Sequence, residues 1–265
     1  IILLFLIKEN IITIDKYITN IITNDKFKLR KYPEYFFNEI KPFIEKDTIE
    51  NFISDDYEKN RENGENEKYV CKLIREDLIE KFITYVNRYD LYLQTTIETS
   101  IFETNLYLLK KPPNLIEYSA FYGSVSIFKY LFLNNVNNRN SSIWPYAIHG
   151  NNPELISFLE DNKIEPNDET YEECLKESIK CHHNDLTNYI MNKFIKEDNK
   201  NFYNNKFSHA FHYHNYLYLP TDPNNNNNFV FFNACRFDYE NIVKYLLQNK
   251  LINANETIIL NYKYL

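Results

Sequence analysis

A group of cysteines and histidines between residues 174 and 214 is the part of this sequence best suited to chemistry. Its members are Cys174, Cys181, His182, His183, His209, His212 and His214. Thiolate sulfur and imidazole nitrogen are ligands that zinc prefers. A neighbouring cysteine and histidine can also serve as a nucleophile and its base. The region 174–214 therefore defines one hypothesis, a metal-binding or enzymatic protein.

The spacing of these residues disfavours that hypothesis. Cys181, His182 and His183 are predicted to lie on a turn, where adjacent side chains diverge, and the sequence has no Cys-x-x-Cys motif. Nothing in the sequence indicates a third group that would orient a catalytic base. Three glycines cannot form a phosphate-binding loop. We therefore predict no catalytic residues, no bound metal and no cofactor.

The acidic stretch at 171–177, YEECLKE, is predicted to form an exposed helix face, with Glu173 and Glu177 one turn apart. A carboxylate pair that acts as acid and base needs burial to shift its pKa values. Cys174 and Cys181, if they share a helix, lie ~10 Å apart along its axis. That separation is too long for a disulfide, so reduced thiols and an intracellular, cytoplasmic location are expected.

The overall composition bounds the class of protein. The chain has 265 residues, of which 44% are hydrophobic, and this suffices for the core of one or two domains. Its net charge is −7 and no basic stripe occurs, so no nucleic-acid partner is expected. The apolar run at 1–7 is shorter than the ~20 residues that span a bilayer, so no membrane partner is expected either.

One pattern recurs along the second half of the chain. It is seen in SAFYGSVSIFKYL, AIHGNNPELISFL, SIKCHHNDLTNYI and ACRFDYENIVKYL. The first apolar residue after each turn is Ile127, Leu155, Leu186 or Ile242, which gives spacings of 28, 31 and 56 residues. A fixed period of this size indicates a repeat array.

Each copy predicts two short helices joined by a sharp turn. The first helix ends in a pair of small or apolar residues, which lets a neighbour approach closely. The turn residues are of types that tolerate left-handed backbone geometry, namely Gly123, Asn151, His182 and Asp238. Ser124 and Asn152 are predicted to cap the second helix, and Pro153 follows the second of these caps.

These stretches resemble the ankyrin repeat, which ends one helix with Ala-Ala, turns at Gly-His and continues Leu-Glu-Ile-Val-Lys-Leu-Leu. More closely, the chain resembles a family of divergent, Asn/Ile/Phe-rich ankyrin-like proteins from AT-rich protist genomes, a domain of unknown function. The resemblance implies an all-α, ankyrin-like helical-hairpin solenoid. Its inter-repeat loops should be short, because the period is nearer 28 than 33 residues and the Thr-Pro-Leu-His signature is absent.

The resemblance also divides the chain. Residues 1–113 are expected to form an N-terminal helical region, with degenerate repeats as an option, and residues 114–265 the ankyrin-like repeats. The expected repeats are 114–140, 141–168, 169–198, a degenerate copy at 199–228, and 229–255. A truncated repeat at the end predicts exposed apolar residues near Ile258, Ile259 and Leu260, and aggregation of this chain.

The function that the resemblance implies is a protein–protein interaction scaffold with an unknown partner, rather than an enzyme. A purely structural helical array is the other alternative. In ankyrin arrays the residues between the small pair and the turn face the partner. Carried onto this chain, these are Phe121, Tyr122, His149, Gly150, Lys180, Cys181, Arg236 and Phe237. They are expected to be exposed, so truncation of Phe121, Tyr122 and Arg236 should weaken binding with little effect on stability.

Overall fold

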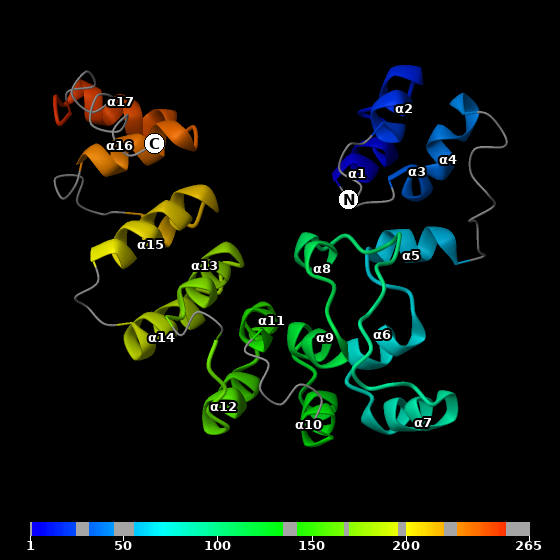
Figure 1. Ribbon diagram of the computed structural model, residues 1–265. Helices are drawn as coiled ribbons and strands as arrows, with labels where there is room; N and C mark the ends of the chain where they lie inside the picture. The colour runs from blue at the N-terminus through cyan, green and yellow to red at the C-terminus, as the bar shows by residue number, and fades with distance from the viewer. Residues whose placement is uncertain are drawn as a thin grey trace. The chain divides into compact units, whose positions relative to one another are not determined.

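Helix is the only regular secondary structure in the described part of the chain. The computed structural model describes residues 2–24, 32–44, 56–134, 142–166, 170–195, 200–219 and 227–252. These residues form seventeen α-helices and two short 3-10 helices, and their one β-type contact is an isolated bridge between Thr96 and Asn114 (Figure 1). The predicted all-α class is confirmed. No described helix has the length and apolar character needed to cross a bilayer.

The chain forms two compact units, Ile1–Asn138 and Arg139–Leu265. The predicted division after residue 113 concerns where the repeat pattern begins, and it stays a prediction. The helices of the first unit are α1 (Ile2–Lys8), α2 (Lys16–Thr23), α3 (Tyr32–Tyr35), α4 (Phe37–Ile40), η1 (Lys41–Phe43), α5 (Tyr57–Asn63), α6 (Tyr69–Arg75), α7 (Ile79–Tyr89), α8 (Leu106–Lys110), α9 (Leu115–Phe121) and α10 (Val125–Leu133).

In the first unit, α6 packs against both α7 and α9, and α10 packs against both α9 and α7. Two helix pairs, α6–α7 and α9–α10, therefore lie side by side. The shorter helices α1 to α4 enclose a separate apolar core (Figure 1).

The second unit repeats the same kind of packing. Its helices are α11 (Ile143–Gly150), α12 (Pro153–Asp161), α13 (Glu172–Lys180), α14 (Asn184–Phe194), α15 (Lys200–His212), η2 (Tyr216–Tyr218), α16 (Asn227–Arg236) and α17 (Glu240–Gln248). Helix α13 contacts α11 on one side and α15 on the other, while α12 and α14 each pair with the helix before them (Figure 1). Helix α15 in turn contacts α16, which pairs with α17.

The second helix of each predicted copy begins where the pattern placed it. Helices α10, α12, α14 and α17 start at residues 125, 153, 184 and 240, each two residues before the apolar residue used to align the copies. The Asn152 side chain caps α12 by accepting from the N–H groups of Glu154 and Leu155, and Pro153 is the first helical residue. The spacings of 28, 31 and 56 residues are therefore spacings between real helices.

Every paired set of helices turns through one left-handed residue. The predicted turn residues have φ values of 46° to 66°, and they are Gly123, Asn151, His182 and Asp238. The same geometry occurs at Asp77 (49°), between α6 and α7, and at His214 (55°), between α15 and η2. These two further turns were missed from the sequence. In the degenerate stretch 199–228, α15 is the first helix of the pair, and the short 3-10 helix η2 takes the place of the second helix.

Small residues near the end of the first helix accept a backbone hydrogen bond from the residue after the turn. After five of the six turns, the next N–H donates to the carbonyl five residues earlier, a bond that satisfies an otherwise free helix-end carbonyl. The donor and acceptor pairs are Leu78 and Leu73, Ser124 and Ser119, His183 and Ser178, Asn215 and Ala210, and Tyr239 and Ala234. All five acceptor residues are fully buried, and four of them are Ser or Ala. A larger side chain there would obstruct the close approach of the neighbouring helix.

A second hydrogen bond links consecutive helix pairs. The side chain just after a turn donates to a helix-end carbonyl of the preceding pair, three residues before that pair's own turn. The bonds run from Ser124 Oγ to Ile74, from Asn215 Nδ2 to Ile179 (3.0 Å) and from the Tyr239 hydroxyl to Phe211 (3.0 Å). The donor and the acceptor each occupy a constant position relative to the turn of their own pair. This bond therefore fixes the register between neighbouring pairs.

The N-terminus of α10 is capped from the neighbouring helix pair. Both carboxylate oxygens of Asp77 accept hydrogen bonds, from the N–H groups of Ser126 and Ile127, each at 3.0 Å. Ser124 occupies the predicted N-cap position, but its hydroxyl does not cap the helix, because it donates to the Ile74 carbonyl instead. An acidic side chain also suits the positive end of the helix dipole.

Replacing Asp77 with alanine should lower the free energy of unfolding by about 1–2 kcal/mol. The change removes the cap of α10, and it places a residue with a Cβ in a left-handed turn without the local hydrogen bonding that favours Asp there. Urea denaturation followed by circular dichroism measures the effect. Asp77→Asn keeps an acceptor and a residue type that tolerates the turn, so it should lose less than half as much. Equal stability of the alanine variant and the wild type would contradict the capping role.

Candidate functional site

The predicted group of cysteines and histidines does not assemble as one site. Cys174 is fully buried, and His182 has its Nε2 3.1 Å from the Tyr213 carbonyl oxygen. His214 contacts the Tyr239 hydroxyl at 2.9 Å, and burial lowers the pKa of His209 to about 4. The expectation that adjacent side chains diverge on the turn is therefore confirmed for His182.

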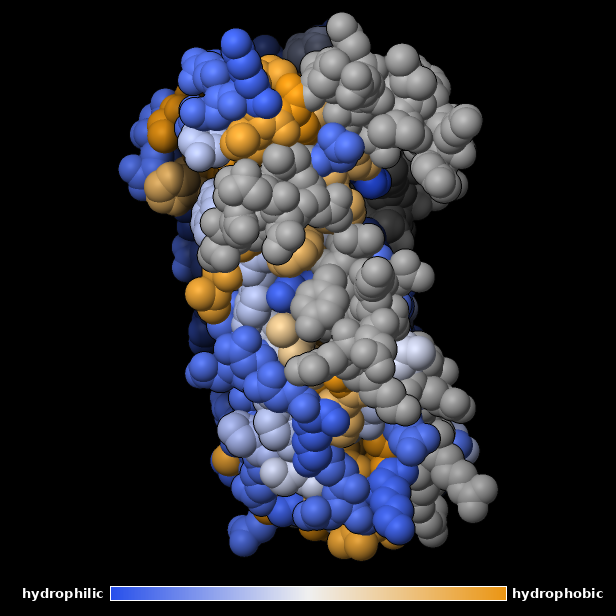
Figure 2. All heavy atoms as spheres, turned by 90° about the vertical axis from the view of Figure 1, so that its left-hand side faces the viewer, coloured by the Kyte–Doolittle hydropathy of each residue, from blue (hydrophilic) through white to orange (hydrophobic). Residues whose placement is uncertain are grey.

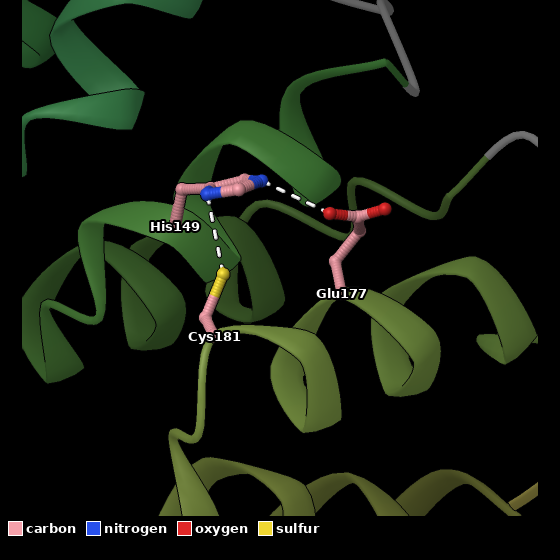
Figure 3. Close-up of side chains that lie close together, drawn as sticks. All are labelled: His149, Glu177 and Cys181. Carbon is pink, nitrogen blue, oxygen red and sulfur yellow. Dashed lines mark hydrogen bonds and ion pairs between the residues drawn. The ribbon is translucent and has the colours of Figure 1, made fainter. Parts of the chain in front are cut away.

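One member of the group, Cys181, instead meets two residues that the sequence analysis did not assign to this group. Its Sγ atom lies 3.2 Å from Nδ1 of His149, and Nε2 of His149 lies 3.0 Å from Oε2 of Glu177 (Figure 3). Lys180 donates to the same Oε2 at 2.7 Å. We call His149, Glu177 and Cys181 the HEC cluster. Within the described residues, it is the group whose donor atoms, all within 4.8 Å of one another, could hold a metal ion.

Local structure explains why these side chains converge. His149 lies in the last turn of α11, two residues before the turn at Asn151. Glu177 and Cys181 are four residues apart at the end of α13, so they project from the same side of that helix. Since α11 packs against α13, the imidazole of the first helix reaches both groups of the second.

Glu177 is buried and ionised. Burial alone would raise its pKa, but hydrogen bonds from His149 and Lys180 outweigh it and lower the pKa to about 2. The prediction of an exposed acidic face is therefore wrong for Glu177, which is only 4% exposed. An ionised carboxylate can only accept a hydrogen bond, so Nε2 of His149 carries the proton. In the neutral imidazole this leaves the Nδ1 lone pair directed at the thiol of Cys181.

The Cys181 thiol is held in its neutral form. Burial, with a further contribution from the charge of Glu177, raises its pKa to about 11. It also sits at the C-terminal end of α13, whose dipole disfavours a negative charge. Reactive cysteines have the opposite setting, with a lowered pKa at a helix N-terminus or beside cations. Glu177 supplies the third, orienting group that the sequence did not reveal, but the thiol itself is poorly suited to act as a nucleophile.

A signal for this cluster was present in the sequence but was not used. His149 and Cys181 both fall in the two positions that precede a turn, in adjacent copies of the repeat. The alignment of the copies gave both residues equivalent places, but it was used only to assign them to a partner-binding surface. Glu177 lies four residues before Cys181, but it was interpreted only together with Glu173, as an exposed acidic face.

The residues predicted to bind a partner differ in their exposure. Phe121 is only 9% exposed, and its ring stacks on that of Tyr107 at 6.4 Å. Tyr122 is half-buried between Tyr118 and the guanidinium of Arg75, which lies 5.9 Å from its ring. The expectation that these positions are exposed is therefore wrong for Phe121, a core residue whose truncation should cost stability. Whether any of them binds a partner stays a prediction.

In the second unit several of the predicted residues contact one another or a residue at the equivalent place of a further copy. The two positions before the turn at His214 add His212 and Tyr213, which the sequence analysis missed. The His212 ring lies 4.4 Å from Tyr213 and 4.9 Å from Phe237, and Arg236 lies over the Phe237 ring at 5.2 Å. We call these positions together the turn strip, defined as His149, Gly150, Lys180, Cys181, His212, Tyr213, Arg236 and Phe237.

Some large apolar side chains of the second unit are exposed. Figure 2 shows hydrophobic residues gathered toward the α16–α17 end of the face that it displays. Tyr245 and Leu247 on α17 are 51% and 42% exposed. The predicted exposure near Ile258, Ile259 and Leu260 lies outside the described residues.

A scan against protein-family models, a search of curated proteins and a search of solved structures all find no match to this chain. The resemblance to ankyrin repeats therefore rests on the residues of this chain alone.

Proposed function

We propose that this chain is a protein-binding scaffold made of ankyrin-like helical hairpins stacked as a solenoid. The observation that carries the proposal is the shared register of the turns. Six helix pairs turn through one left-handed residue each, and three of them are joined to the preceding pair by the same side-chain-to-carbonyl bond. Repetition of one connection between neighbours is typical of solenoids.

Stacked repeats place equivalent residues of successive copies next to one another, and such surfaces commonly serve as binding sites. The turn strip has this character within the second unit. Its side chains include Arg, Tyr, Phe and His, and aromatic residues and Arg are enriched at the energetic centres of protein interfaces. His212 and Arg236 are exposed, whereas Cys181, Tyr213 and Phe237 are half-buried and support them.

Replacing His212 or Arg236 with alanine should weaken binding of a protein partner by about 1–3 kcal/mol each. Both side chains are exposed, so the free energy of unfolding should change by less than about 0.5 kcal/mol. Wild-type and variant chains are used to isolate partners from an extract of the native cell, with quantitative mass spectrometry. Titration calorimetry then measures the affinity of each partner that depends on the strip.

Tyr245→Ala is the matched control, because Tyr245 is exposed on α17 and lies outside the strip. A photo-crosslinking residue at position 212 should capture the same partner, while one at position 245 should not. Partners recovered equally, and with unchanged affinity, by the His212→Ala, Arg236→Ala double variant would refute the assignment of the strip.

A further inference from the structure

The HEC cluster brings together three donor atoms of the kinds that a zinc-class cation takes. His149 offers an imidazole nitrogen, Cys181 a sulfur and Glu177 a carboxylate oxygen, and these atoms lie within 4.8 Å of one another. Zinc–ligand bonds of about 2.0–2.3 Å place tetrahedral ligand atoms about 3.5 Å apart. The pair formed by Sγ of Cys181 and Nδ1 of His149, at 3.2 Å, is already close to this separation.

The charges of the three groups also match a divalent cation. Glu177 is an anion, and Cys181 becomes one when a metal replaces its proton, so a cation of charge +2 with these ligands is neutral overall. A neutral assembly is the form that burial favours, and Glu177 is only 4% exposed. A thiolate ligand selects zinc or a similar soft cation over calcium and magnesium, which prefer oxygen ligands alone.

We propose that His149, Glu177 and Cys181 bind one Zn²⁺ ion, which joins α11 to α13 and so links two neighbouring helix pairs. In the binding step the S–H bond of Cys181 breaks, the S–Zn bond forms and the proton leaves to solvent. Glu177, whose Oε2 contacts His149 and Lys180, supplies the oxygen ligand once its carboxylate turns from Nε2 of His149 toward Cys181 (Figure 3). A water molecule completes the four ligands.

Lys180 provides a further test of the proposal, because its ammonium group lies 2.7 Å from Oε2 of Glu177. A positive charge at this distance stabilises the metal-free cluster and opposes a second cation. Removing it with Lys180→Gln should therefore tighten zinc binding several-fold. If the cluster were only a hydrogen-bonded network that holds two helices together, the same change would produce no metal affinity.

The test uses the full chain, stripped of metal and kept reduced with a phosphine. Titration with Co²⁺, a spectroscopic substitute for Zn²⁺, should give thiolate-to-cobalt charge-transfer absorption that saturates at one ion per chain and is displaced by Zn²⁺. Cys181→Ser should abolish this absorption, and His149→Gln and Glu177→Gln should weaken binding at least tenfold. Cys235→Ser is the matched control and should bind as the wild type does, because Cys235 is exposed and lies on α16.

A measurement on the unaltered chain guards against variants that fold poorly. Zn²⁺ should slow the alkylation of Cys181, followed by mass spectrometry, while Cys235 in the same molecule reacts at an unchanged rate. The absence of cobalt absorption at millimolar metal, its persistence in Cys181→Ser, or alkylation of Cys181 at the metal-free rate would each overturn the proposal. The partner-binding role of the turn strip is tested separately, through His212 and Arg236, which are not substituted in the zinc experiments.

Discussion

Replacing Trp144 with alanine should lower the free energy of unfolding by about 3–5 kcal/mol. The side chain is fully buried at the start of α11, and its indole N–H donates to the Ile164 carbonyl. Its ring lies edge-on to Tyr171 at 5.2 Å and to Phe194 at 6.0 Å. The substitution therefore leaves a large cavity between two helix pairs and removes the partner of a helix-flanking carbonyl.

Denaturation in urea, followed by far-ultraviolet circular dichroism, measures this loss, because that signal reports helix content and does not need the tryptophan. Trp144→Phe keeps most of the packing and loses only the N–H donor, so it should lose clearly less stability than the alanine variant. Tyr216→Ala is the surface control, because Tyr216 is 70% exposed, and it should change stability by less than about 0.5 kcal/mol. An unfolding midpoint of Trp144→Ala equal to that of the wild type would show that the second unit is not packed around this residue.

Glu177 should make the protein lose about 3 kcal/mol of stability as the pH falls from about 4.5 to about 2. Its pKa is 4.5 when exposed to solvent and about 2 in the folded chain, where His149 and Lys180 hold it. A group whose pKa is lowered by folding stabilises the folded state above its unfolded pKa. That contribution disappears as acid protonates the folded carboxylate. Because the residue is 4% exposed, solvent screens these contacts little.

The measurement compares wild type with Glu177→Gln by urea denaturation from pH 7 down to about pH 1.5, below the folded pKa of Glu177. The variant should be less stable near neutral pH, and the difference should shrink steadily through the acid range, because both chains then carry an uncharged side chain. Asp161→Asn, an exposed acidic position at the end of α12, controls for the general effect of removing a negative charge. A difference between wild type and Glu177→Gln that stays constant across this range would contradict the assigned pKa.

Local features of the fold were predictable because each depends on residues close together in the chain. The second helices begin where the apolar spacing indicated, since helix formation needs only a suitable stretch with a cap such as Asn152. The turns at Gly123, Asn151, His182 and Asp238 were predictable from residue types that tolerate a positive φ. The turn at His214 was missed because a 3-10 helix follows it, so the second half of that copy has no helical pattern to align.

Neighbours across helix pairs were not predictable in the same way. Asp77 reads as an ordinary acidic residue in sequence, yet it caps a helix that begins 48 residues later. Phe121 was taken as exposed by its place before a turn, and it is buried because Tyr107, from outside the repeat pattern, stacks on it. In both cases the partner belongs to an element that the repeat alignment did not include.

By itself, the sequence determined that this chain is helical, where its paired helices begin and which residues turn between them. Only the tertiary structure decided that His149, Glu177 and Cys181 meet, and that the acidic residue among them is buried rather than solvated. The physical reason is the range of the forces involved. Helices and turns are set by backbone hydrogen bonds over a few residues. The HEC cluster instead depends on how closely α11 packs on α13. The small buried residues that allow this approach do not indicate, in the sequence, which side chains lie beside them.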